Sequence, residues 1–183
     1  MLQRFAFIGL TLMSLVLLHH QADIADDGPS HLKNETLVVA RIGDSNTFAA
    51  YSKYSGKWLT HTFAEGLTAF PVMVESLVAF QVEGDTVTEL VAVDRNGKWR
   101  THQLPDTGSR TCTPFVGSDV AAFSIDGTAY AFSGISGSWA STALSAPPQI
   151  ASDYAMILSE DRISVFSAHT GSWAESPVLT IVK

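Results

Sequence analysis

Short apolar stretches alternate with polar turns along most of the chain, in a pattern that repeats four times. In each repeat an apolar strand, a tight polar turn and a second strand are followed by a glycine-containing turn and a tryptophan that opens a third strand. A proline-containing link then leads to a further apolar segment. The expected first strands are Leu37–Ile42, Leu77–Val82, Val120–Ile125 and Tyr154–Leu158. Runs of this length between turn signals are typical of β-strands.

The pattern predicts an all-β fold. No segment after residue 30 shows a capped 3.6-residue apolar period, and turns such as Asp126-Gly127 supply the positive φ that tight hairpins need. Because one sheet cannot bury both of its faces alone, we expect the four repeats, of about four strands each, to stack around an axis as a small β-propeller. Four copies disfavour a three-fold β-trefoil.

The repeat is clearest around the tryptophans, which are separated by 41, 40 and 34 residues. A period of this size indicates a propeller, a solenoid or an array. We interpret the tryptophans as packing between units rather than as platforms for sugars. The predicted structural repeat positions are Tyr51, Gly56, Trp58, Gly97, Trp99, Phe132, Gly137, Trp139, Phe166, Gly171 and Trp173.

This motif resembles the second half of a kelch repeat, in which an aromatic residue and a tryptophan stand seven positions apart. The pairs with that spacing are Tyr51/Trp58, Phe132/Trp139 and Phe166/Trp173, and Val93/Trp99 is one residue shorter. The paired glycines of kelch repeats are missing, and the period is shorter than the roughly 50 residues usual for them. The resemblance implies a kelch-like β-propeller. The count of four copies leaves three arrangements open: a four-bladed ring, half of an eight-bladed dimer, or the remnant of a longer array.

The N-terminal segment predicts export. The apolar run Phe5–Leu18 follows Arg4 and suits the core of a signal peptide better than a transmembrane helix. We predict a signal peptide, or an uncleaved anchor helix, at 1–25, a linker at 26–34 and a four-repeat domain at 35–183. The repeats are expected at about 35–74, 75–116, 117–151 and 152–183. The expected location is secreted or periplasmic, with membrane attachment only through an uncleaved N-terminal segment.

Composition narrows the classes of function. The net charge is −7 and no cluster of basic residues occurs, which argues against binding to nucleic acid or to an anionic membrane surface. Cys112 is the only cysteine, so the chain has neither an internal disulfide nor a cysteine-based metal site. No phosphate loop, nucleophile elbow or HExxH motif is present. We predict no cofactor, no metal and no catalytic residue.

Two sets of polar residues are candidates for binding. His61 and His102 each lie three residues after a tryptophan, so adjacent units would bring them to one surface. Asp119 and Asp153 precede the first strands of the third and fourth repeats, where carboxylates around an axis would face a ligand or a cation. Solvent-facing strand positions and Ser-Asp turns explain the same patterns without a ligand.

The sequence favours an exported, non-enzymatic binding or scaffold domain that recognises a protein, peptide or glycan through propeller loops, as a monomer or homodimer. The alternative is a carbohydrate-active hydrolase or lyase with carboxylates at the propeller axis. A structural spacer without a specific ligand is a third interpretation. Desolvated carboxylates that converge in a concave pocket favour the enzyme, and a flat or ringed loop face favours the binding domain.

Overall fold

The computed structural model describes residues 31–105 and 108–178, and within these ranges it contains strands and turns but no helix. The strands form four antiparallel sheets that follow one another in chain order. Sheet 1 contains β1 (His31–Lys33), β2 (Leu37–Arg41), β3 (Thr47–Ser52) and β4 (Lys57–Thr62). Sheet 2 contains β5 (Thr68–Met73), β6 (Val78–Glu83), β7 (Glu89–Val93), β8 (Trp99–Gln103) and β9 (Thr111–Cys112).

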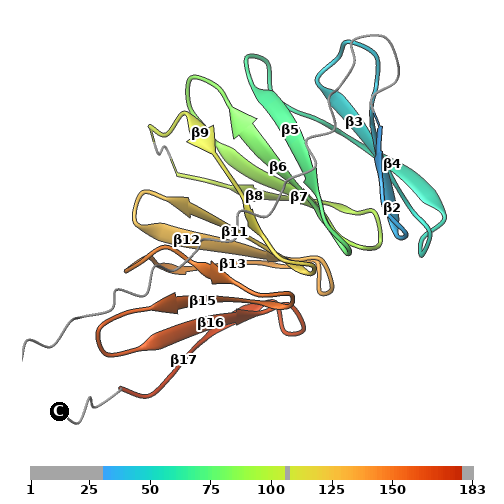
Figure 1. Ribbon diagram of the computed structural model, residues 1–183. Helices are drawn as coiled ribbons and strands as arrows, with labels where there is room; N and C mark the ends of the chain where they lie inside the picture. The colour runs from blue at the N-terminus through green and yellow to red at the C-terminus, as the bar shows by residue number, and fades with distance from the viewer. Residues whose placement is uncertain (1–30, 106–107, 179–183) are drawn as a thin grey trace, which may run out of the picture.

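Sheet 3 contains β10 (Phe115–Val116), β11 (Val120–Ile125), β12 (Thr128–Ser133) and β13 (Trp139–Ala143). Sheet 4 contains β14 (Gln149–Ile150), β15 (Tyr154–Leu158), β16 (Ile163–Ser167) and β17 (Ser172–Glu175). The sheets lie side by side like the blades of a fan, with sheet 1 and sheet 4 at opposite ends of the row (Figure 1). The prediction of an all-β, propeller-like fold with four repeats is confirmed. The predicted N-terminal helix lies outside the described residues.

The boundaries between sheets differ from the predicted repeat boundaries. The apolar segment after each tryptophan strand begins the next sheet instead of completing its own: β5 pairs with β6 along its whole length, from Thr68↔Glu83 to Met73↔Val78. Only residues 74–77 separate β5 from β6, and so short a connection places consecutive strands side by side. The first sheet likewise begins inside the predicted linker 26–34, because β1 pairs with β2. The segment 179–182, which was expected to fill the same role after the last repeat, lies outside the described residues.

Sheet 2 holds a fifth strand that the repeat pattern did not predict. β6 and β7 pair only at Val78↔Val93 and Ala79↔Ala92, and β9 pairs with the other end of β6 through Val82↔Cys112. The insertion leaves the Cys112 side chain 1% exposed, and this burial raises the pKa of its thiol to about 12. The thiol is therefore protonated at neutral pH and is not a nucleophile.

Three hydrophobic clusters join consecutive sheets, and each includes the tryptophan of the later sheet. Each of these indoles also donates a hydrogen bond to the preceding sheet. The acceptor is the backbone carbonyl one residue after the tryptophan of that preceding sheet. The three bonds are Trp99 Nε1 to Leu59 O at 2.9 Å, Trp139 Nε1 to Arg100 O at 3.1 Å and Trp173 Nε1 to Ala140 O at 3.2 Å. The tryptophans of sheets 2 to 4 therefore pack between sheets.

The glycine two residues before each tryptophan has a positive φ, between 63° and 78°. A side chain at this position would strain the backbone. Space is also short in the later sheets: a Cβ at Gly137 would lie 2.6 Å from Asp94 Oδ2 of the preceding sheet. Glycine therefore allows both the tight turn and the close approach of neighbouring sheets.

No helix among the described residues is long and apolar enough to cross a membrane. The predicted signal peptide lies outside the described residues.

Candidate functional site

The chain turns between the first and second strands of every sheet at equivalent positions. We call these four turns, residues 34–36, 74–76, 117–119 and 151–153, the corner row. Each corner is closed by the same backbone hydrogen bond across three residues. These bonds are Asn34 N to Leu37 O at 2.9 Å, Val74 N to Leu77 O at 3.1 Å, Gly117 N to Val120 O at 2.8 Å and Ala151 N to Tyr154 O at 2.9 Å.

Hydrogen bonds also tie neighbouring corners to each other. Ser76 N donates to Ser118 O at 3.1 Å, and Asp119 N donates to Ser152 O at 2.7 Å. In the first corner a side chain makes the connection: the Asn34 amide nitrogen donates to the backbone oxygen of Glu75 at 3.3 Å and to that of Val74. The corner row is therefore a continuous, hydrogen-bonded edge of the molecule, built from residues far apart in sequence.

A hollow lies over three of the four corners. It is lined by Val74, Glu75, Val116, Gly117, Ser118, Ile150, Ala151 and Ser152. The lining combines three branched apolar side chains with one carboxylate and two hydroxyls. Because equivalent positions of three consecutive sheets meet here, the hollow repeats similar chemistry along its length. This repetition suits an extended ligand better than a compact one.

The predicted candidates Asp119 and Asp153 occupy equivalent positions in the third and fourth corners. Their backbone oxygens accept hydrogen bonds from Gly134 N at 2.9 Å and Ala168 N at 2.8 Å. The carboxylate of Asp153 lies 3.7 Å from His169 Nε2, and the side chains are 49% and 66% exposed, respectively. Each aspartate directly follows a serine that lines the hollow, Ser118 or Ser152.

The other two candidates, His61 and His102, lie elsewhere. The His61 ring stacks on Trp99 of the next sheet, with ring centres 5.1 Å apart and planes at 22°. The His102 ring is tilted against Tyr130 and Trp139 of sheet 3, at 5.3 and 6.0 Å. Each ring therefore lies beside an interface tryptophan of the next sheet and is only partly exposed.

Burial lowers the pKa of both histidines. For His61 desolvation is the largest cause, and the Glu89 carboxylate 3.7 Å from Nε2 opposes it. Nε2 of His61 is buried and has no hydrogen-bond partner among the described residues. For His102 desolvation alone lowers the pKa. Both rings therefore favour the neutral form in the folded chain.

This preference predicts a pH-dependent stability. In the unfolded chain these histidines bind protons near the ordinary pKa of about 6.5, whereas in the folded chain they do so only at lower pH. Over this pH range the unfolded chain therefore binds more protons than the folded chain, so the free energy of unfolding should fall as the pH drops from 7.5 to 5.5. Urea unfolding at pH 7.5, 6.5 and 5.5 measures the decline. The double variant His61→Gln/His102→Gln should decline less steeply, while His169→Gln, at an exposed site, should behave as wild type. An unchanged decline in the double variant would contradict this assignment.

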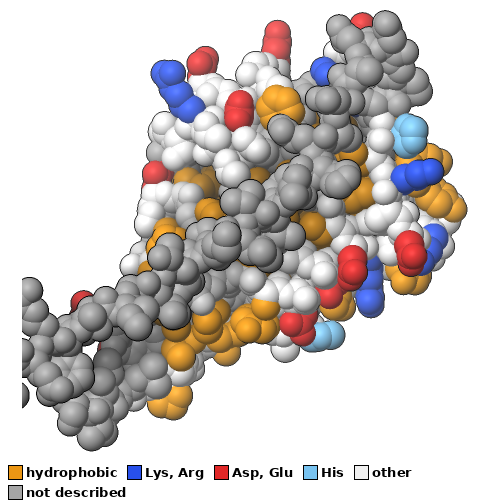
Figure 2. All heavy atoms as spheres, in the orientation of Figure 1, with side chains coloured by type: hydrophobic (Ala, Val, Ile, Leu, Met, Phe, Trp, Pro, Cys, Tyr) orange, Lys and Arg blue, Asp and Glu red, His pale blue; other side chains and the backbone are white. Residues whose placement is uncertain are grey.

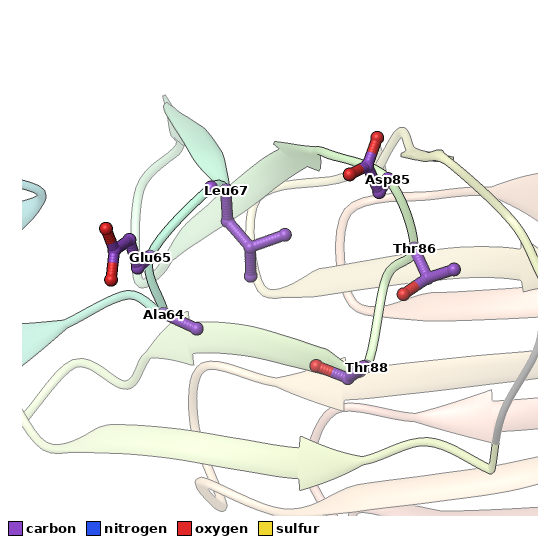
Figure 3. A pocket seen from close by; sticks show the side chains of 7 residues that line it. Ala64, Glu65, Leu67, Asp85, Thr86 and Thr88 are labelled. Carbon is purple, nitrogen blue, oxygen red and sulfur yellow. The ribbon is translucent and has the colours of Figure 1, made fainter.

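Charged side chains of both signs are scattered over the visible face, and no basic patch gathers there (Figure 2). A second hollow lies between the link 64–67 and the turn 85–88 of sheet 2. Figure 3 shows Leu67 pointing toward its centre, while Glu65 and Asp85 lie on opposite sides of it. Its two carboxylates therefore do not converge on a common point. No group of three or more metal-ligating side chains occurs in the described part of the chain.

The sequence identified the two aspartates of the corner row but did not identify the hollow. Val74, Val116 and Ile150 line it from three sheets, and Asn34 ties the first corner to the second. The sequence does carry a signal for the corners, because each lies at the same distance in sequence before the first predicted strand of a repeat. The tertiary arrangement was needed to show that the corners lie next to each other.

No family model and no curated protein matches the chain. Among solved structures, virginiamycin B lyase from Staphylococcus aureus is 16% identical with a TM-score of 0.38, over 79% of this chain and 53% of that one. A streptogramin B lyase structure is 15% identical with a TM-score of 0.38, over 84% and 55%. The chain spans about half the length of these structures, and a likeness at this level carries neither an activity nor a site over to it.

Proposed function

We propose that this chain is an exported, non-enzymatic binding or scaffold domain that holds an extended peptide segment of a partner protein in the hollow of the corner row. The observation that carries the proposal is the hollow itself, where three consecutive sheets present equivalent residues. The apolar side chains of Val74, Val116 and Ile150 would receive side chains of the peptide. The hydroxyls of Ser118 and Ser152 would bond to its backbone.

A peptide fits this lining better than a glycan. Sugar rings are usually recognised by an exposed aromatic face, but no tryptophan lines the hollow. Three tryptophans pack between sheets, and the fourth, Trp58, lies on the outer side of sheet 1. The enzyme alternative needs converging carboxylates, and Glu75 is the only carboxylate among the residues that line the hollow. The lining therefore favours binding over hydrolysis.

Binding to a peptide library and to a glycan array tests the proposal. The double variant Glu75→Lys/Ser152→Arg changes exposed residues at two corners, so it should fold normally. We expect it to weaken binding to any selected peptide at least tenfold, which corresponds to about 1.4 kcal/mol. The matched control Glu65→Lys, which changes an exposed carboxylate at the other hollow, should bind as wild type.

Two outcomes would overturn the proposal. Equal binding by wild type and by the double variant would remove the hollow from recognition. Release of shortened products from a glycan by the wild type, but not by Asp119→Asn or Asp153→Asn, would instead establish the carbohydrate-active enzyme.

A further inference from the structure

Every contact between consecutive sheets uses the same two complementary surfaces. We call the side of a sheet that faces the preceding sheet, and that carries its tryptophan, the leading face. The opposite side is the trailing face. Across each internal contact the leading-face indole donates to a trailing-face carbonyl, as described above. In two of the contacts a trailing-face serine also donates to the later sheet, Ser52 to Arg95 O at 2.6 Å and Ser133 to Ala168 O at 2.5 Å.

Within the described residues, no sheet packs against the leading face of sheet 1. Its centre is apolar, with Val38, Ala40, Ile42, Ala49, Tyr51 and Trp58. Three threonines of β3 and β4 share this face, and His31 and Lys33 lie on it at the edge strand β1. Trp58 is 54% exposed and Ile42 is 46% exposed. Within the described ranges the Trp58 indole nitrogen has no hydrogen-bond partner, unlike its three equivalents. Hydrophobic side chains are visible at this end of the row, at the right of Figure 2.

The glycine turn beside Trp58 is likewise not covered by any neighbouring group among the described residues. A Cβ at Gly56 would meet nothing within 4 Å, although Gly56 has the same positive φ as its equivalents. By contrast, a Cβ at Gly171 would overlap the Ser136 hydroxyl of the preceding sheet, and one at Gly137 would press against Asp94. The first sheet thus keeps a turn shaped for a neighbouring sheet.

The trailing face of sheet 4 carries the complementary half. Its alternating residues are Tyr154, Met156, Leu158, Ile163, Val165 and Ser167, without a charge among them. Tyr154 is 41% exposed and Leu158 is 40% exposed. The carbonyl of Ala174, which corresponds to the three indole acceptors, receives no indole from the described residues. The Ser167 hydroxyl accepts from His169 N but donates to no carbonyl there.

We propose that a second copy of this chain covers these faces, with sheet 4 of one copy packed on sheet 1 of the other. The chain already forms this interface three times. Within the described residues, its two halves are uncovered at the two ends of the row of sheets, and the donors of one half match the acceptors of the other. Trp58 Nε1 would donate to the Ala174 carbonyl of the second copy, and Gly56 would lie against Thr170 and Ser172. Two such contacts related by a two-fold axis complete an eight-bladed ring, within the size range of propellers.

The mass of the full 183-residue chain tests the proposal, and native mass spectrometry from a mild detergent is suited to a chain with an apolar N-terminal run. We expect a species of twice the chain mass at micromolar concentration. Trp58→Asp damages the leading face alone and Leu158→Asp damages the trailing face alone. For each variant by itself we expect the dissociation constant of the dimer to rise at least tenfold, so that the monomer predominates at the same concentration. Phe115→Asp, at an exposed aromatic on sheet 3, should stay dimeric.

Mixing the two variants distinguishes this arrangement from other dimers. The intact trailing face of the Trp58→Asp chain should pair with the intact leading face of the Leu158→Asp chain, so an equimolar mixture should recover a heterodimer through one contact. Circular dichroism of each variant verifies that it is folded. A wild-type monomer, a single variant that remains dimeric, or folded variants that fail to pair when mixed would each overturn the proposal.

Discussion

Replacement of Gly117 by alanine should lower the free energy of unfolding by about 3 kcal/mol or more. The added Cβ would overlap the carbonyl oxygen of Ala151 and lie 2.9 Å from its carbonyl carbon. Both obstacles are backbone atoms of the neighbouring corner, so no side-chain rotation relieves the clash. Sheets 3 and 4 must separate at the corner row, and the hydrogen bond from Asp119 N to Ser152 O must lengthen or break.

Urea unfolding of Gly117→Ala beside Gly84→Ala measures this effect. A Cβ at Gly84 would also overlap a neighbour, but that neighbour is the Leu67 Cδ2 methyl, at the end of a flexible side chain. We expect Gly84→Ala to cost about 1 kcal/mol, because Leu67 can adopt another rotamer. If the two variants prove equally stable, the corner row is not as closely packed as the structure shows.

Replacement of Asp94 by alanine should cost about 3 kcal/mol. The Asp94 side chain is 1% exposed, and its Oδ1 accepts hydrogen bonds from Asn96 N at 2.8 Å and Lys98 N at 3.0 Å. Its Oδ2 accepts from Nε and Nη2 of Arg100, both at 3.2 Å. Truncation removes the acceptor for two backbone donors and the partner of a guanidinium. Because the Arg100 side chain is 38% exposed, water compensates part of the loss, which places the expected cost at the lower end of the range for a broken buried pair.

Two variants serve as controls for Asp94→Ala in the same unfolding experiment. Asp161→Ala removes a carboxylate that is 57% exposed and pairs with Arg162 at 3.7 Å, and it should change the free energy of unfolding by less than about 0.5 kcal/mol. Asp94→Asn keeps one carbonyl acceptor for the turn and loses the charge, so it should fall between the two. A cost for Asp94→Ala no larger than that of Asp161→Ala would show that the buried carboxylate does not hold the turn.

The glycine and tryptophan positions show why local structure followed from the sequence. Strands, hairpins and the glycine before each tryptophan depend on contacts within a few residues, so alternation of apolar residues and turn chemistry are sufficient to predict them. The pairing of each aromatic with its tryptophan, such as Phe132 with Trp139, follows from the same short turn. The four-fold repeat made these local predictions mutually consistent.

The candidate site was predicted only in part. The sequence predicts Asp119 and Asp153 as equivalent positions, because each precedes the first strand of its repeat. His61 and His102 are also equivalent, but the sequence does not show that tryptophans from the next sheet cover their rings. Whether a strand residue faces solvent or a neighbouring sheet depends on the stacking of sheets, which brings together residues about forty positions apart.

By itself, the sequence determined that this protein is built from four β repeats, each with a glycine turn before a tryptophan strand, because these features arise from periodic patterning and short-range backbone geometry. The tertiary structure alone decided which sheet each apolar segment joins, how β9 enters sheet 2, and that sheets 1 and 4 stand at opposite ends of a row. It also decided that three corners share one hollow. The physical reason is that strand pairing and sheet stacking join residues far apart in sequence. Several similar apolar surfaces could pair locally, and the arrangement that forms is the one with the lowest free energy for the whole chain.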